Sequence, residues 1–196
     1  MRRAWILIGA AAIVGGGCIP EAHERAEPVR RVITHPDGLA YHEARIILSG
    51  KPLDTTWTRE LKDGRITFQA LSEGRMVEEE VYQVQDGNLE LIKIGDMEFV
   101  PPIRLFKNPV LLNDAWRWSG QAKGMAESLP AEAKLTADEE RLNKVGGPYD
   151  TIRTHVSLTL ISPDGTRRDR NMTFWAVDGR GIVCRDLDQY STREPK

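Results

Sequence analysis

The sequence predicts an all-β fold: a single curved antiparallel sheet or half-barrel built from consecutive hairpins, after an N-terminal signal peptide. Turn dipeptides of the Asp-Gly type recur at short intervals, and the segments between them alternate apolar and polar residues, as half-buried strands do. The chain lacks the alternation of strands with helical segments that indicates a parallel sheet. Regular short strands joined by tight turns are typical of antiparallel sandwiches and barrels.

The first 18 residues have the pattern of a lipoprotein signal peptide. Two arginines follow Met1, an apolar run extends over residues 4–14, and three glycines precede Cys18. The run is too short for a membrane helix, which needs about 20 apolar residues. A plain cleaved signal is the alternative, but it leaves Cys18 without a role. Bacterial lipoprotein signals resemble this segment, so we expect residues 1–17 to be a lipoprotein signal peptide and Cys18 to carry lipid.

Residues 18–38 are expected to form the lipidated cysteine and a flexible tether, because they contain three prolines and little hydrophobic periodicity. Ile19 stands where inner-membrane lipoproteins of the best-known type carry Asp. By that resemblance we expect attachment to the outer membrane through Cys18, with the protein facing the periplasm. Residues 39–196 then form one β-rich periplasmic domain, which is long enough for a hydrophobic core.

The charged residues, cysteines and histidines of the sequence do not indicate a nucleic-acid partner or a metal site. The signal peptide holds two of the 27 Lys and Arg residues, so the mature chain keeps 25 against 29 Asp and Glu, a formal charge of −4. This balance does not predict a nucleic-acid partner, which requires a basic surface. Cys184 lies in an apolar stretch and is expected to be a small buried hydrophobe. The histidines lack the close spacing of zinc ligands, so no metal or cofactor is predicted.

The hairpins can be placed in order along the chain from their turn dipeptides. The expected turns are Asp63-Gly64, Glu73-Gly74, Asp86-Gly87, Asp164-Gly165 and Asp178-Gly179. Asp-Gly favours type I′ turns, because both central residues of such a turn have positive φ. The expected strands between them cover residues 66–70, 77–84, 89–94, 152–160, 170–177 and 181–189.

Residues 126–145 fit two interpretations. The segment is rich in helix formers. Its residues Ala133, Leu135 and Ala137, however, alternate with polar residues as in a half-exposed strand. We favour the strand.

Three segments resemble uncharacterised secreted bacterial β-proteins of the lipoprotein type. Residues 145–153 are similar to a tight turn that leads through an aromatic residue into a long strand, with Gly146-Gly147-Pro148 in place of the usual Pro-Ala-Gly. Residues 174–183 are similar to their closing hairpin, and residues 111–118 to their Leu-rich loop before a Trp strand. The resemblance implies a strongly curved antiparallel sheet in the form of a half-barrel. That shape is similar to the lipoprotein carriers LolA and LolB, whose concave faces hold acyl chains.

Four aromatic residues are the candidate ligand-binding residues. Trp116 and Trp118 are two residues apart, so on a strand both point to one face. Trp175 lies on another expected strand, and Phe106 lies in an apolar connection over residues 100–112. These side chains either pack in the core or line an apolar concavity that the connection covers.

No recognisable catalytic motif is present. The sequence lacks a Gly-x-Ser-x-Gly nucleophile elbow, a P-loop, a His-Glu-x-x-His motif and an EF-hand loop. The acidic runs 78–80 and 138–140 are interpreted as solvated charges, and so is the pair Asp186 and Asp188. No catalytic residue is therefore predicted.

Together these features predict a non-enzymatic, membrane-anchored envelope lipoprotein that binds an apolar ligand, such as a lipid, or an envelope protein. The alternative is a structural adaptor with a filled core and no ligand. An enzyme with an unrecognised site is the remaining hypothesis. A cavity that could hold an acyl chain favours ligand binding, whereas a solid core favours the adaptor.

Overall fold

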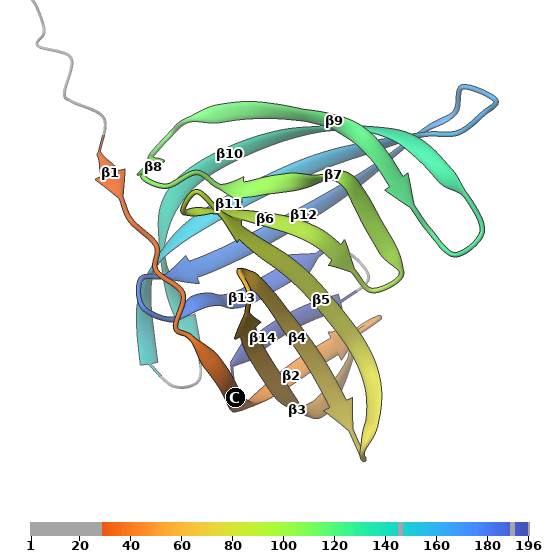
Figure 1. Cartoon of the computed structure of the whole chain (residues 1–196). Helices are drawn as coiled ribbons and strands as arrows, with labels where there is room; N and C mark the ends of the chain where they lie inside the picture. Colours follow the sequence, from red (N-terminus) through yellow and green to blue (C-terminus); the bar gives the residue numbers. More distant parts are fainter. Residues whose placement is uncertain (1–28, 145–146, 189–190, 196) are drawn as a thin grey trace, which may run out of the picture.

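The computed structural model describes residues 29–144, 147–188 and 191–195 (Figure 1). The expected signal peptide, Cys18 and the first part of the expected tether lie outside the described residues, as do Val145 and Gly146 of the expected turn. All regular structure in the described ranges is β-strand. The strands are β1 (Arg30–Arg31), β2 (Gly38–Leu48), β3 (Lys51–Lys62), β4 (Arg65–Ser72), β5 (Arg75–Gln85), β6 (Asn88–Ile94), β7 (Met97–Phe106), β8 (Val110–Leu111), β9 (Ala115–Lys123), β10 (Ser128–Lys144), β11 (Gly147–Ile161), β12 (Arg167–Val177), β13 (Gly181–Leu187) and β14 (Ser191–Pro195).

Twelve of these strands close into one antiparallel barrel, in the order β10-β11-β12-β13-β14-β2-β3-β4-β5-β6-β7-β9. The expected all-β antiparallel architecture is confirmed, but the half-barrel is wrong. Closure comes from two contacts: β14 pairs with β2, with Arg193 opposite Ile46, and β9 pairs with β10. Pairing the last strand with the first long one removes the two open edges that a half-barrel would expose.

The local turn chemistry sets most of the hairpins. Asp63 and Gly64 both have positive φ, at 52° and 73°, and the Glu73-Gly74 and Asp86-Gly87 turns share this geometry. Type I′ turns match the twist of the strands that they join. At Asp164-Gly165 and Asp178-Gly179 only the glycine has positive φ. The five dipeptides all lie between strands, as predicted.

Residues 128–144 form a strand and not a helix. β10 pairs along its length with β11, where Leu135 lies opposite Val156, and also with β9. Both side chains are buried, which explains why the alternation is more informative here than helix propensity.

The prediction that residues 100–112 form an apolar connection is wrong, because residues 97–106 form β7 and residues 110–111 form β8.

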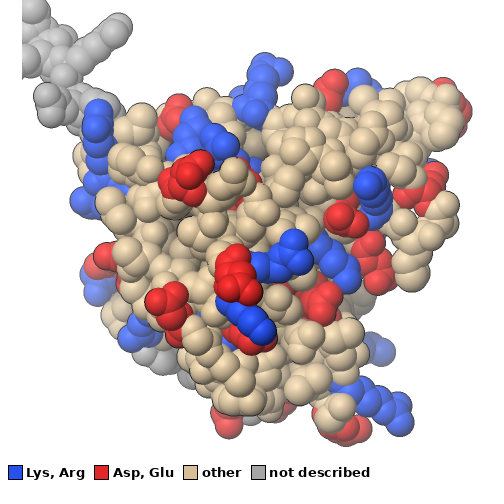
Figure 2. Space-filling model, in the orientation of Figure 1, with Lys and Arg blue, Asp and Glu red and all other residues tan. Residues whose placement is uncertain are grey.

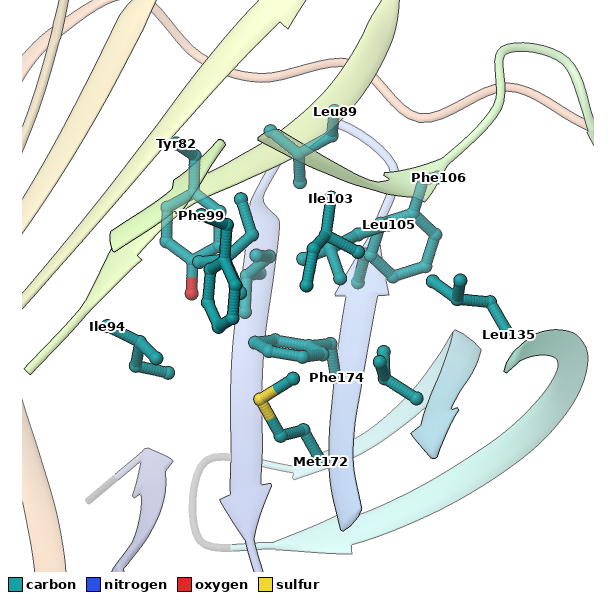
Figure 3. Close-up of a cluster of buried hydrophobic side chains, with 14 of the residues drawn as sticks. Tyr82, Leu89, Ile94, Phe99, Ile103, Leu105, Phe106, Leu135, Met172 and Phe174 are labelled. Atoms are coloured by element: carbon teal, nitrogen blue, oxygen red, sulfur yellow. The ribbon is translucent and has the colours of Figure 1, made fainter. Parts of the chain in front are cut away.

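The barrel is filled by apolar side chains from nearly every strand. Figure 3 shows one cluster of these side chains. Tyr82, Phe99, Phe106 and Phe174 are fully buried or nearly so, together with leucine and isoleucine side chains from β6, β7 and β10. Three edge-to-face ring contacts link Trp57 to Phe68, Phe68 to Tyr82 and Tyr82 to Phe174. The middle of the barrel is therefore a packed core.

Candidate functional site

The two ends of the barrel differ, because the N-terminal segment covers one of them. The described chain runs from β1, which pairs with β8, down to the start of β2 (Figure 1). On the way Ile33 is buried in the core, and Thr34 donates to the Asp178 carboxylate from its backbone N–H (2.9 Å) and its hydroxyl (2.7 Å). Residues 30–37, which fall in the expected tether, thus lie against the end of the barrel that carries the β12–β13 turn.

The opposite end of the barrel is open and holds a pocket of about 580 Å³. We call it the open-end pocket. Its wall is formed where β2, β6 and β13 end and where β5, β7 and β12 begin. The apolar side chains of the wall include Leu48, Val77, Ile94, Met97, Met172 and Leu187. Pockets that bind small molecules commonly measure about 300–1,000 Å³ and have mostly apolar walls.

Polar groups lie among these apolar side chains. Glu78 and Ser191 both line the open-end pocket. The Glu78 Oε1 accepts hydrogen bonds from Arg185 Nη2 and, at 3.4 Å, from the Ser191 hydroxyl. The Glu78 side chain is only 9% exposed, and its Oε2 is buried without a hydrogen-bond partner among the described residues. The lining also includes Ser49, Asp96, Arg170 and Asn171, so the wall combines apolar side chains with polar groups, among them this buried acceptor.

Behind the pocket lies a cluster of buried charges, formed by Glu80, Arg185 and Arg193. Arg185 Nε donates to Glu80 Oε1 at 2.7 Å, and Arg193 Nη2 donates to Glu80 Oε2 at 3.0 Å. The Tyr82 hydroxyl also donates to Glu80 Oε2, at 2.7 Å. Burial alone would raise the pKa of Glu80, but the charges of Arg193 and Arg185 and the hydrogen bonds to its oxygens lower that pKa to about 2. Glu80 is therefore ionised at neutral pH.

The cluster is joined to the aromatic core. The Arg193 guanidinium lies 4.7 Å from the ring centroid of Trp57 and 4.8 Å from that of Phe68. Such cation–π contacts are strongest where the cation has lost its water, and the Arg193 side chain is almost fully buried. The aromatic rings thus hold Arg193 in place beside Glu80.

The interpretation of residues 78–80 as solvated is wrong for two of the three carboxylates. Glu78 and Glu80 point into the barrel from β5, on the same face as Tyr82, and Glu79 points outward to Lys93. From the sequence alone, the alternation Glu-x-Glu-x-Tyr predicts a solvated strand face, because ionised carboxylates are rarely buried without partners. Their partner Arg185 lies on β13, far away in the sequence, so no local pattern indicated the pairing.

Trp116 and Trp118 lie at the seam between β7 and β9. The two strands pair only over Glu98–Val100 of β7. Beyond that point the indole N–H groups of Trp116 and Trp118 donate to the β7 carbonyls of Arg104 (2.8 Å) and Pro101 (3.0 Å). The rings therefore bridge the seam where the backbone ladder stops, and neither ring lines the open-end pocket.

Phe106 and Trp175 have different surroundings. Phe106 is buried in the core (Figure 3). Trp175 is half-buried, and its indole N–H donates to the Glu140 carboxylate at 2.6 Å. Arg153 bridges Asp138 and Glu140 beside it, so these two carboxylates of the run 138–140 are paired on the barrel surface. The structure thus does not bring the four predicted aromatic residues together at one site.

Charged side chains of both signs are mixed on the surface of the described residues. Lysine, arginine and acidic side chains are interspersed on the face shown in Figure 2. Within the described ranges, no group of three or more His, Cys, Asp or Glu side chains is arranged to hold a metal ion. Cys184 is buried, as expected. No helix in the described part of the chain is long and apolar enough to cross a membrane.

Comparison with known proteins adds evidence on the fold. No protein-family model and no curated protein matches the chain. Two solved structures do. One is described as a putative exported protein with YmcC-like fold from Bacteroides fragilis; it has 11% identity and a TM-score of 0.52, over 85% of this chain and 98% of that chain. The other is described as a putative lipoprotein from Parabacteroides distasonis; it has 10% identity and a TM-score of 0.53, over 86% and 98%.

The chain is therefore an all-β protein whose closed antiparallel barrel has one covered and one open end. It shares its overall fold with these two bacterial proteins.

Proposed function

We propose that this protein is a non-enzymatic lipoprotein of the bacterial envelope, attached to the outer membrane through lipid on Cys18, whose barrel binds an apolar ligand at its open end. The open-end pocket is the observation that carries the ligand, because it is the right size and is mostly apolar. The signal-peptide pattern before Cys18 supports the envelope. The fold shared with an exported protein and a lipoprotein, as those two are described, supports it too.

The arrangement of the two barrel ends suits this role. The described chain reaches the barrel at its covered end, and the open-end pocket lies at the other. A protein anchored through Cys18 would therefore present the pocket away from its own anchor and towards the periplasm. A diacylglycerol on Cys18 would supply the two acyl chains that stable anchoring needs.

A second candidate, a structural adaptor that binds an envelope protein, is favoured by two side chains on the outer face of β2. Leu39 and Tyr41 are exposed on that face although both are large and largely apolar. The filled middle of the barrel fits this role equally well. An adaptor needs no occupant in the open-end pocket, so a ligand-binding experiment separates the two candidates.

The test compares two leucines of the same strand. The mature chain without Cys18, residues 19–196, contains every described residue. It is secreted, recovered gently from the host periplasm and examined by native mass spectrometry. We expect an extra mass that organic extraction removes. Leu48→Gln, in the pocket wall, should weaken retention of this mass about tenfold, because it places an amide against the apolar ligand.

Leu39→Gln is the matched control, because Leu39 is on β2 outside the pocket and 55% exposed, against 37% for Leu48. This control should retain the extra mass. If wild-type protein carries no extra mass and takes up no added decyl-chain compound, the ligand-binding proposal is refuted and the adaptor becomes the better account.

A further inference from the structure

We infer that the ligand of the open-end pocket is a neutral amphiphile with an alkyl chain and a hydrogen-bond donor, a hydroxyl or an amide N–H, which binds the free oxygen of Glu78. The inference rests on the function proposed above and specifies the chemistry of the ligand. It starts from the Glu78 carboxylate, whose Oε2 is buried and has no hydrogen-bond partner in the described part of the chain.

A buried carboxylate oxygen without a partner destabilises the fold, because it has lost its hydrogen bonds to water and accepts none from the protein in their place. The other oxygen of Glu78 is held by Arg185 and Ser191, so the carboxylate cannot turn away. Glu78 also lines the pocket, so this buried acceptor belongs to a side chain of the pocket wall. The flexible methionines Met97 and Met172 line the same pocket and can shift to admit a small polar group.

The charges around Glu78 favour a neutral donor over a charged one. Two buried carboxylates, Glu78 and Glu80, face two buried guanidinium groups, those of Arg185 and Arg193, so the cluster is already balanced. The pocket wall carries two further charged residues, Asp96 and Arg170, which have opposite signs and add no net charge. A charged head group would therefore add a charge that no group of the wall is left to balance. An anionic head group would be repelled by the unpartnered oxygen. A hydroxyl or amide N–H satisfies that oxygen without adding charge.

The test uses two probes that differ in one hydrogen-bond donor: 1-decanol, and decyl methyl ether, which has no donor. Their dissociation constants are measured by calorimetry on the mature chain. We expect wild-type protein to bind the alcohol about tenfold more tightly, since a hydrogen bond to a charged group contributes to affinity on that scale.

Glu78→Gln should abolish this preference. Arg185 needs an acceptor, so the glutamine amide would turn its NH₂ group towards the pocket, where the alcohol and the ether can both accept a hydrogen bond. The two affinities should then agree within about twofold, because the ether gains a hydrogen bond that the wild-type carboxylate cannot offer it and its affinity rises towards that of the alcohol. Glu79→Gln is the matched control, because Glu79 contacts Lys93 and Gln69 outside the pocket, and it should keep the tenfold preference.

The outcomes separate this inference from the proposed function. Equal binding of the two probes by wild-type protein would overturn the donor requirement and leave the apolar-ligand proposal intact. A tenfold preference that persists in Glu78→Gln would overturn the role of Glu78. Binding of neither probe would overturn both proposals. The wild-type comparison requires no variant, so the inference can fail even if Glu78→Gln does not fold.

Discussion

Glu80→Gln should be among the most destabilising substitutions of a polar residue in this protein. Glu80 is fully buried and accepts hydrogen bonds from Arg185, Arg193 and Tyr82. Among the described residues, the change leaves Arg185 with the Glu78 carboxylate and removes the carboxylate that pairs with Arg193. Removing one member of a buried ion pair costs about 3–5 kcal/mol of unfolding free energy. The fall of the Glu80 pKa from 4.5 to about 2 gives a similar size, about 3 kcal/mol, since one pKa unit corresponds to about 1.4 kcal/mol.

The same cluster sets a pH dependence whose sign follows from the pKa. The folded-state pKa of Glu80 lies below its ordinary value of 4.5, so its stabilising contribution is complete above pH 4.5 and is lost as the pH falls towards about 2. Wild-type protein should therefore lose stability over this interval. Glu80→Gln should lack this part of the loss, because glutamine does not titrate.

Urea denaturation followed by circular dichroism measures both effects, at pH 7 and at steps down to pH 2.5. Glu60→Gln is the control, because Glu60 is exposed on β3 and its loss should cost less than about 0.5 kcal/mol. A loss below about 1 kcal/mol for Glu80→Gln at pH 7, close to the cost of an ordinary surface change, would show that the buried cluster does not stabilise the barrel as described.

Three further predictions concern the seam and the anchor. Trp118→Ala should lower the unfolding free energy by about 3 kcal/mol, the low end for aromatic truncation because the ring is half-buried; an unchanged melting temperature would show that the bond to Pro101 does not support the seam. Gly120→Ala should cost about 1–3 kcal/mol by thermal melting, because its Cβ would lie 2.5 Å from the Val100 carbonyl oxygen, and a neutral effect would contradict the close packing there. Cys18→Ser should block lipid-linked maturation, and an unchanged mass of the membrane-extracted protein would refute lipidation.

Local features of the sequence were enough to predict five of the turns between strands. Asp63-Gly64 adopts the positive φ angles that its residue types favour, and the alternation around Leu135 places β10 correctly despite its helix-forming composition. One turn of the same kind, Ser49-Gly50, escaped prediction although both its residues have positive φ. Turns and alternation depend on neighbouring residues, so they leave a direct trace in the sequence.

Closure of the barrel could not be predicted in this way. It depends on the pairing of β14 with β2, such as Thr192 opposite Ile47, between segments at opposite ends of the domain. Neither strand carries a residue pattern that specifies its partner. A half-barrel and a closed barrel share the same hairpins and differ only in such long-range pairs.

The candidate site escaped prediction for a related physical reason. Glu78 and Glu80 resemble a solvated strand face until Arg185 and Arg193 are placed beside them, and the arginines come more than 100 residues later. The aromatic residues, by contrast, were predicted as site residues but lie outside the site. Trp118 was predicted from its type and spacing as a candidate for ligand binding, but it lies at the seam and outside the open-end pocket.

The most direct test of the account is methyl NMR of the mature chain with its methionines labelled. Met97 and Met172 line the open-end pocket, whereas Met76 and Met125 are 58% and 87% exposed and lie outside it. On titration with 1-decanol we predict that the Met97 and Met172 methyl signals shift and saturate together, while those of Met76 and Met125 stay fixed. Shifts confined to Met76 or Met125, or no shift at all, would contradict ligand binding at the open end of the barrel.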